Sequence, residues 1–300
     1  MNSNSDTPIT FIIDVGANDG AFTIEAATAN PNCMVLAIEA IPELCEEIER
    51  NQIHRNLKNI KIINRAISSS SVARAFYVSK NGDMGTSSLF QFNKENINND
   101  CYWSRRRDLQ HEEKIMVETA TLEDIFNEEK IQEVGFLKID AQGADLEVFL
   151  SLGRHLTKIK SGVLESSSTK KKSLYGPKMP DLRETLNTLV EHSFDIHGIH
   201  PNDPSGNEYN IQFNAPTVDF DSNASALSLC AIKAYSGKLF WHLPSDKLTD
   251  YTTEIHNLKT KLHDARTILH SLHGQVHESN SCIISLKSEL DGVAATLSEF

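Results

Sequence analysis

The stretch Phe11-Ile12-Ile13-Asp14-Val15-Gly16-Ala17-Asn18-Asp19-Gly20 decides the fold class of this chain. An apolar run that ends in an acid and meets a turn predicts a buried strand of a parallel sheet. The glycines of the turn allow the backbone to approach a ligand closely. Residues 22–29 are expected to form a helix, whose free N–H groups point at the same place. Strand, glycine turn and helix in this order predict a nucleotide-like ligand at the carboxyl edge of a sheet.

Further strand-like and helix-like segments follow along the chain. We expect strands at 34–39, 60–64, 73–79, 114–119, 136–140 and 161–165, and helices at 41–56, 122–126, 145–152 and 180–192. Residues 194–199 and 227–234 are expected to be closing strands, joined by a loop rich in Pro, Asn and Gly. Alternating strands and helices with acids at strand ends predict a doubly wound α/β sheet.

Composition narrows the class of protein. A formal net charge of −12 argues against a nucleic-acid partner, because such partners are bound by clustered Lys and Arg. Two basic runs, 105–107 and 170–172, are either solvated loops or contacts for an anionic substrate or membrane surface. The five cysteines form no C-x-x-C pair, which favours reduced thiols and a cytoplasmic location. Residues 1–8 are polar and are expected to be disordered, and no apolar stretch approaches the roughly 20 residues of a transmembrane segment.

The pattern changes after residue 243, where apolar residues recur every seven positions. The first series is Leu248, Ile255, Leu262, Leu269, Val276, Ile283, Leu290 and Leu297, and a second runs three residues later from Tyr251 to Phe300. Such a and d positions predict a long coiled-coil helix over 244–300 and self-association through it. The alternative is a long helix that packs back on the domain formed by residues 9–243.

The glycine turn also indicates which ligand it binds. A dinucleotide site needs a glycine where this chain has Asn18, so the ligand is expected to lack a pyrophosphate there. The carboxylate of Asp14 would repel phosphates and attract an ammonium group. S-adenosylmethionine has an amino-acid end, a ribose and a sulfonium, and no phosphate. Glu39, at the end of the next strand, suits the ribose hydroxyls. The alternative is that Asp14 and Glu39 only cap helices.

Several motifs together resemble the FkbM-type family of class I methyltransferases, over approximately residues 9–235. They are Asp14-Val-Gly-Ala-Asn-Asp-Gly20, Ala37-Ile-Glu39, Asn64-Arg-Ala66, Thr86-Ser-Ser-Leu89, Thr121-Leu122 and Leu137-Lys-Ile-Asp-Ala-Gln-Gly143 followed by Leu146-Glu147. The resemblance implies a mostly parallel, Rossmann-like sheet of seven strands, S-adenosylmethionine as methyl donor, and O-methylation of a sugar, polyketide or related hydroxyl in a surface polysaccharide, another glycan or a natural product. It does not extend to the heptads.

The same resemblance implies the residues of the cofactor site. These are Asp14, Gly16, Ala17, Asn18, Gly20, Thr23, Glu39 and Ala66, with Asp140 beside the reactive methyl group.

Transfer to a hydroxyl also needs a base that takes its proton, and acids at strand ends are the candidates. We therefore expect Asp140 and Glu165 to be the catalytic residues. Two other roles stay open for them: Asp140 holding the donor and Glu165 binding an acceptor hydroxyl. His197 and His200 are further candidates for the base or are surface histidines. Asp140 and Glu165 could also bind a divalent metal, but the family resembled is not regarded as metal-dependent, so no metal is expected.

The acceptor is expected to be a small molecule or a glycan. Residues 81–113 form a long polar segment, which is either a lid over the acceptor or a disordered surface loop. Two other functions compete with methyl transfer. One is an inactive methyltransferase-fold scaffold that oligomerises through the coiled coil, and the other is an NAD-linked oxidoreductase, which Asn18 disfavours.

Overall fold

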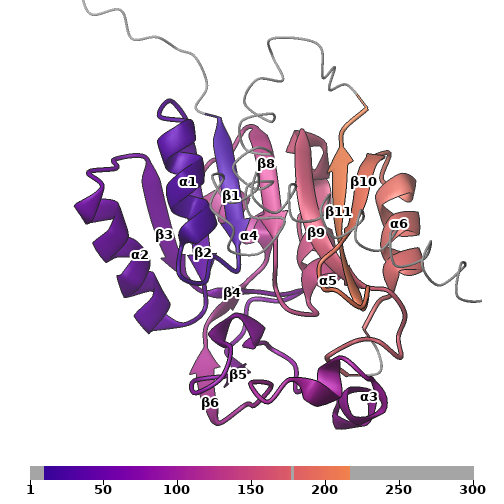
Figure 1. Cartoon of the computed structure of the whole chain (residues 1–300). Helices are drawn as coiled ribbons and strands as arrows, with labels where there is room; N and C mark the ends of the chain where they lie inside the picture. The colour runs from indigo at the N-terminus through magenta and orange to yellow at the C-terminus, as the bar shows by residue number, and fades with distance from the viewer. Residues whose placement is uncertain (1–9, 177–178, 217–300) are drawn as a thin grey trace, which may run out of the picture. The chain divides into compact units, whose positions relative to one another are not determined.

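The computed structural model describes residues 10–176 and 179–216. Seven strands form one sheet in the order β10-β11-β9-β8-β1-β2-β3 (Figure 1). In chain order they are β1 (Phe11–Val15), β2 (Met34–Glu39), β3 (Ile60–Asn64), β8 (Val134–Ile139), β9 (Ser161–Ser167), β10 (Asp195–Pro201) and β11 (Glu208–Asn214). Only β11 runs antiparallel to both neighbours in the sheet. The predicted seven-stranded, mostly parallel Rossmann-like sheet is confirmed.

Helices cover both faces of this sheet. The residues of β1 alternate between the faces, because successive side chains of a strand point to opposite sides. Ile12 packs with α1 (Ala21–Ala29) and α2 (Pro42–His54). Ile13 packs with α4 (Leu122–Glu128), α5 (Asp145–Leu150) and α6 (Leu182–Glu191). A strand buried on both faces explains the unbroken apolar run that precedes the glycine turn.

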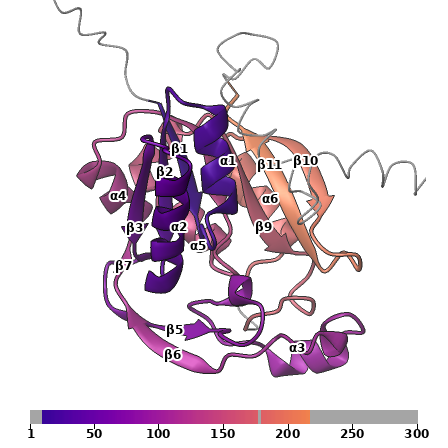
Figure 2. The same ribbon diagram turned by 60° about the vertical axis from the view of Figure 1, so that its left-hand side comes forward.

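A smaller layer lies under the carboxyl ends of the parallel strands. Its frame is the antiparallel pair β5 (Arg74–Val78) and β6 (Glu113–Val117), and the short parallel pair β4 (Ala66–Ile67) and β7 (Thr119–Ala120) joins it to the sheet. Between β5 and β6 the chain forms η1 (Met84–Thr86), α3 (Lys94–Asn99) and η2 (Trp103–Arg105). We call residues 74–117 the cap. Both views place β5, β6 and α3 below the strands (Figures 1 and 2).

Two expectations from the sequence need correction. The segment after β10 was expected to be a loop, but it contains β11, which inserts between β9 and β10. Asn210 and Asn214 lower the strand propensity of this segment and mask the alternation of Tyr209, Ile211 and Phe213. Residues 81–113 were expected to be either a lid or a disordered surface loop, and they carry α3 and two 3-10 turns.

Several expectations fall outside the described residues. They concern the disordered segment 1–8, the closing strand at 227–234 and the coiled coil at 244–300. Within residues 10–176 and 179–216, no helix is both long enough and apolar enough to cross a membrane.

Candidate functional site

The glycine turn after β1 is anchored on the ends of two neighbouring strands. Gly16 and Gly20 have φ angles of +73° and +76°, which L side chains rarely adopt. A Cβ on Gly16 would lie 1.9 Å from the main-chain oxygen of Asp140, so the turn lies directly against the end of β8. The N–H groups of Gly16 and Ala17 both donate to the carbonyl of Ile38, at 2.9 and 3.1 Å. Position 16 therefore needs glycine because its φ angle is positive and because a Cβ there would collide with Asp140.

Asp14 forms an ion pair inside the sheet. It is the register partner of Lys138 on β8, and Lys138 Nζ lies 2.9 Å from Asp14 Oδ1. The hydroxyl of Thr23 donates to Asp14 Oδ2 at 2.6 Å, and Asp14 is completely buried. Burial alone would lower the pKa of Lys138, but the charges of Asp14 and Asp140 raise it above its ordinary value. The hydrogen bond between Thr23 and Asp14 thus joins the two sides of the glycine turn, and Lys138 neutralises the charge of Asp14.

Lys138 also reaches the acid that follows its own strand. Its Nζ lies 3.6 Å from Asp140 Oδ2 and 3.3 Å from the carbonyl oxygen of Gly16. The side chain of Asp140 is 21% exposed, whereas that of Asp14 is 0% exposed. Of the two acids that contact Lys138, Asp140 is therefore the accessible one. Sequence reasoning missed Lys138, although a lysine within the apolar run of β8 signals a buried cation that needs a partner.

Glu39, at the end of β2, shapes the turn from the other side. Its two carboxylate oxygens accept from the N–H groups of Asn18, at 2.8 Å, and Ile41, at 2.9 Å. Burial raises the pKa of Glu39, and these two hydrogen bonds oppose that rise. Asn18 has a φ of +51°, a conformation that asparagine tolerates better than most residues.

Most residues expected at the cofactor site gather at these strand ends. Asp14, Gly16, Ala17, Asn18, Gly20 and Thr23 lie at the end of β1 and the start of α1, with Glu39 at the end of β2 and Asp140 at the end of β8. Ala66, on β4, packs in a cluster with Ala40 and Ile41, directly after Glu39.

A pocket lies near Asp140, between β9, β11 and the start of α5. Its lining contains the polar residues Asp145, Glu165, Ser166, Ser167, Tyr175 and Glu208, together with Gly143, Leu146, Met179 and Pro180. Asp145 accepts from the N–H groups of Ala141, Gly143 and Glu165 at 3.2–3.4 Å. Sequence reasoning did not identify Asp145, Tyr175 or Glu208, because only the insertion of β11 and the return of the chain through Tyr175 bring them to one place.

Burial dominates the electrostatics of this pocket. It raises the pKa of Glu165 well above the usual range, and the charges of Glu208, Asp140 and Asp145 add to the rise. Burial and the charge of Asp140 raise the pKa of Asp145 to about 7. Asn202 donates a hydrogen bond to Glu165. The pocket therefore contains a carboxyl group, Glu165, that holds its proton more tightly than an exposed glutamate does.

Neither the metal nor the histidine alternative gains support from the described residues. Among them, no group of three or more His, Cys, Asp and Glu side chains is placed to hold a metal ion. His197 and His200 are exposed on β10, the edge strand of the sheet. The structure thus brings Asp140 and Glu165 to the same region and leaves the histidines at the edge.

The cap contacts two turns of the site: the glycine turn and the turn at Gln142, which follows β8. A Cβ on Gly85 of the cap would lie 3.5 Å from Asn18 Nδ2 in the glycine turn. The hydroxyl of Ser88 donates to the carbonyl of Gln142 at 2.7 Å, and the hydroxyl of Tyr175 donates to the carbonyl of Thr86 at 2.8 Å. These contacts hold the cap against the glycine turn and Gln142, and a lid over the acceptor stays a prediction.

Comparison with known proteins connects this geometry to a family. Residues 14–196 match the family model described as Methyltransferase FkbM domain. Methyltransferase sdnD of Sordaria araneosa is 26% identical over 171 residues, which cover 52% of this chain and 66% of that protein. Methyltransferase 1 of Beauveria bassiana (strain ARSEF 2860) is 26% identical over 166 residues, 53% of this chain and 66% of that protein. The chain thus spans just under two thirds of the length of these relatives.

Solved methyltransferase structures are similar only at a low level. TrmK of M. capricolum, in complex with S-adenosyl-homocysteine, gives a TM-score of 0.38 at 11% identity and covers 84% of this chain and 90% of its own. Fibrillarin of Aeropyrum pernix, with natively bound S-adenosyl-L-methionine, gives 0.37 at 10% identity, with 69% and 66% covered. The assignment therefore depends on the family match, which covers more than half of the chain, and on the motifs placed at the strand ends. The chain belongs to the FkbM methyltransferase family.

Proposed function

We propose that this protein transfers a methyl group from S-adenosylmethionine to a hydroxyl group of a sugar or a similar polyhydroxylated acceptor. The observation that carries the proposal is the buried Glu165, with its raised pKa, in a polar pocket beside Asp140. Family membership supports methyl transfer, and the lining of the pocket supports the class of acceptor.

The residues of the glycine turn fit this donor. The acids Asp14, Glu39 and Asp140 lie at these strand ends, and Lys138 forms ion pairs with Asp14 and Asp140, so the excess charge of these four residues is negative. Such a site repels a pyrophosphate and attracts a cationic ligand. Glu39 would hold the ribose hydroxyls. Because Asp14 is already paired with Lys138, we assign the ammonium end of the donor to Asp140, the more exposed acid. When bound, S-adenosylmethionine supplies a methyl carbon activated by the adjoining sulfonium.

Glu165 has the properties of the base. A base works best when its pKa lies near the operating pH, and burial moves the pKa of Glu165 in that direction. In its ionised form it takes the proton of the acceptor hydroxyl. Ser166, Ser167 and Glu208 supply hydrogen-bonding groups for further hydroxyls. An anionic acceptor is disfavoured because Asp145, Glu165 and Glu208 all carry carboxyl groups.

The test combines binding with product analysis. Calorimetric titration with S-adenosylhomocysteine is expected to show binding, and a panel of neutral sugars is expected to contain one that gains a methyl group by mass spectrometry. Absence of binding would refute the proposal. If only amines or only acidic sugars are methylated, the class of acceptor is wrong.

Glu165→Gln tests the base. We expect kcat to fall by roughly 10²- to 10⁴-fold with little change in affinity for S-adenosylhomocysteine. Because the pKa of Glu165 is raised, wild-type kcat is expected to increase with pH through that pKa, and this limb is expected to disappear in the variant. Glu118→Gln, at an exposed position directly after the cap, is the matched control. An unchanged pH profile in Glu165→Gln would assign the base elsewhere.

A further inference from the structure

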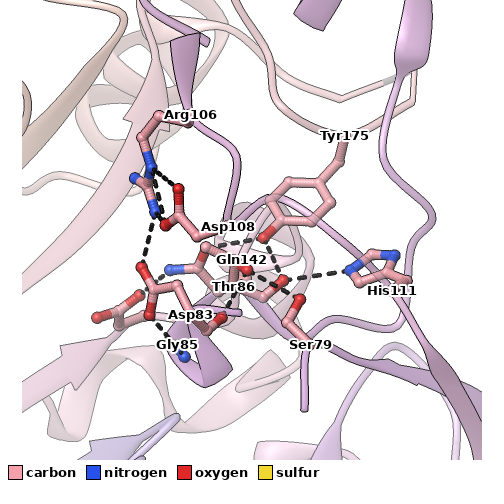
Figure 3. A network of polar contacts seen from close by, with 10 residues as sticks. Ser79, Asp83, Gly85, Thr86, Arg106, Asp108, His111, Gln142 and Tyr175 are labelled. Atoms are coloured by element: carbon pink, nitrogen blue, oxygen red, sulfur yellow. Dashed lines mark hydrogen bonds and ion pairs between the residues drawn. The ribbon is translucent and has the colours of Figure 1, made fainter. Parts of the chain in front are cut away.

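A series of close polar contacts runs from Thr86 of the cap through Tyr175 to Gln142 (Figure 3), and from Gln142 to Asp140. The hydroxyl of Tyr175 lies 2.8 Å from the carbonyl oxygen of Thr86 in the cap and 2.8 Å from Gln142 Oε1. On the other side of the same amide, Gln142 Nε2 donates to Asp140 Oδ1 at 2.7 Å. Two side chains therefore connect the main chain of the cap to the accessible acid of the cofactor site.

The hydroxyl of Tyr175 has one proton for two accepting oxygens, the carbonyl oxygen of Thr86 and Gln142 Oε1, so it donates to one of them at a time and lies in close contact with the other. An ionised carboxylate only accepts, so Gln142 must present its amide nitrogen to Asp140 and its amide oxygen to Tyr175. Tyr175 is 2% exposed, and burial, together with the charges of Glu208 and Glu165, raises its pKa well above the usual value. Tyr175 therefore keeps its proton and donates it. Rotating the amide of Gln142 by 180° would set its oxygen against the carboxylate oxygen of Asp140.

The backbone around Gln142 is held in an unusual conformation. Gln142 has a φ of +50° and Gly143 one of +90°. A Cβ on Gly143 would lie 2.8 Å from Cδ2 of Tyr175, so this turn packs directly against the tyrosine ring. The cap also contacts Gln142 through the hydroxyl of Ser88. Strained residues that persist at a site are held there by their surroundings, here Tyr175 and the cap.

The cap secures the other end of the series. The ring of Phe92 stacks between Tyr175, with ring centroids 5.6 Å apart, and His111, at 3.7 Å. His111 Nε2 lies 3.4 Å from the carbonyl oxygen of Thr86, the same oxygen that Tyr175 contacts. The hydroxyl of Thr86 bonds to Ser79 and to the carbonyl of Asp83, at 3.0 and 2.7 Å. Because Thr86 is bonded to several residues of the cap, it is expected to move together with the cap.

We propose that Tyr175 and Gln142 are positioning residues that couple closure of the cap to the orientation of Asp140. The carboxylate of Asp140 is fixed toward the cofactor while Thr86 lies against Tyr175, and it is released when the cap lifts. This inference rests on the proposed function, because Asp140 is taken there as the acid that receives the donor. It adds regulation of that site by the cap.

Two small substitutions break the series at different links. Tyr175→Phe removes one hydroxyl and leaves the ring in place. Gln142→Asn keeps an amide and suits the positive φ, but its side chain is too short to bridge Tyr175 and Asp140. Tyr102→Phe is the matched control, since its hydroxyl makes no hydrogen bond recorded within the described residues.

The decisive measurement is the affinity for S-adenosylhomocysteine of both single variants and the double variant. Links in series predict the same loss, about tenfold, in all three, because breaking either link already releases Asp140. If the two losses multiply to about a hundredfold in the double variant, the residues act independently and the inference is wrong.

Coupling must also act in the reverse direction. Bound S-adenosylhomocysteine is expected to slow amide hydrogen exchange across residues 83–92 in wild type and in Tyr102→Phe, and to do so much less in saturated Gln142→Asn. Equal protection in Gln142→Asn and wild type would overturn the inference, because a merely structural role for Gln142 leaves this difference intact.

A ligand-free measurement separates this inference from the proposed function. Crystal structures without ligand are expected to show one rotamer of Asp140 in wild type and more than one in Tyr175→Phe. A single, unchanged rotamer in Tyr175→Phe would refute the coupling even if the cofactor binds. If wild type binds no S-adenosylhomocysteine, the proposed function fails, and the rotamers of Asp140 still decide the coupling.

Discussion

At the scale of single residues, the ion pair between Lys138 and Asp14 is the most consequential feature of the site. Asp14 is fully buried, and Lys138 is its only cationic contact within the part of the chain that the structure describes. A buried ion pair contributes little net stability, because desolvation offsets the attraction. Removing one partner is strongly destabilising, because it leaves the other charge buried without a partner. The pair therefore fixes the glycine turn, and the loss of either residue is expected to destabilise the fold.

Lys138→Met is expected to lower the free energy of unfolding by about 3–5 kcal/mol, because the charge of Asp14 stays buried without its partner. Adding Asp14→Asn is expected to restore most of this loss. Urea denaturation measures both variants. Lys61→Met, in an exposed ion pair with Glu129 on the same sheet, is the control and is expected to change stability by less than about 1 kcal/mol. Additive losses in the double variant would contradict this account.

At the scale of elements, the cap is fastened to the rest of the domain through Asp100. Its carboxylate accepts from the N–H groups of Tyr102 and Trp103 at 2.8 and 2.9 Å, and from Asn207 Nδ2 at 3.0 Å. Lys172 completes the set, and its carbonyl accepts from Trp103 Nε1 at 3.0 Å. One carboxylate thus joins α3, η2, the loop after β9 and the turn before β11.

This fastening is predicted to weaken in acid. Burial by itself raises the pKa of Asp100, but the hydrogen bonds from Lys172, Trp103 and Tyr102 lower it from 3.8 to about 2. Because the folded pKa is below the unfolded value, the stabilisation is present above about pH 4 and is lost as the pH falls toward 2. The shift corresponds to about 2 kcal/mol.

Asp100→Asn is therefore expected to be less stable at pH 7 and to have a flatter dependence of stability on pH between 5 and 2. Urea unfolding across this range measures both properties, with the exposed Asp195→Asn as control. A variant that loses stability in parallel with wild type on acidification would show that Asp100 does not fasten the cap.

At the scale of the whole molecule, the heptads after residue 243 remain a prediction from the sequence. We propose that they drive self-association, because apolar a and d positions gain most when they are buried between helices. A chain that ends at residue 243 is expected to be a folded monomer, and the full chain an oligomer, by light scattering. Leu262→Asp, at an a position, is expected to shift the full chain toward the monomer. Equal masses of the full and shortened chains would refute self-association through this segment.

Local signals in the sequence were sufficient for most of the framework. Short apolar runs bounded by turns located six strands of the main sheet, and the glycine turn located the candidate cofactor site, because both signals depend on neighbouring residues only. Acids at strand ends identified Asp14, Glu39, Asp140 and Glu165, since parallel strands end at one edge. The sequence by itself thus determined the fold class and the side of the sheet that bears the site.

The tertiary structure alone decided which of these acids are accessible and what controls them. Lys138 neutralises Asp14 only because β8 lies beside β1 in the matching register. Glu208 reaches Glu165 only because β11 inserts next to β9. Tyr175 meets Thr86 from 89 residues away in the chain. No local preference encodes such contacts, because they are stabilised only once strand order and burial have placed distant segments side by side.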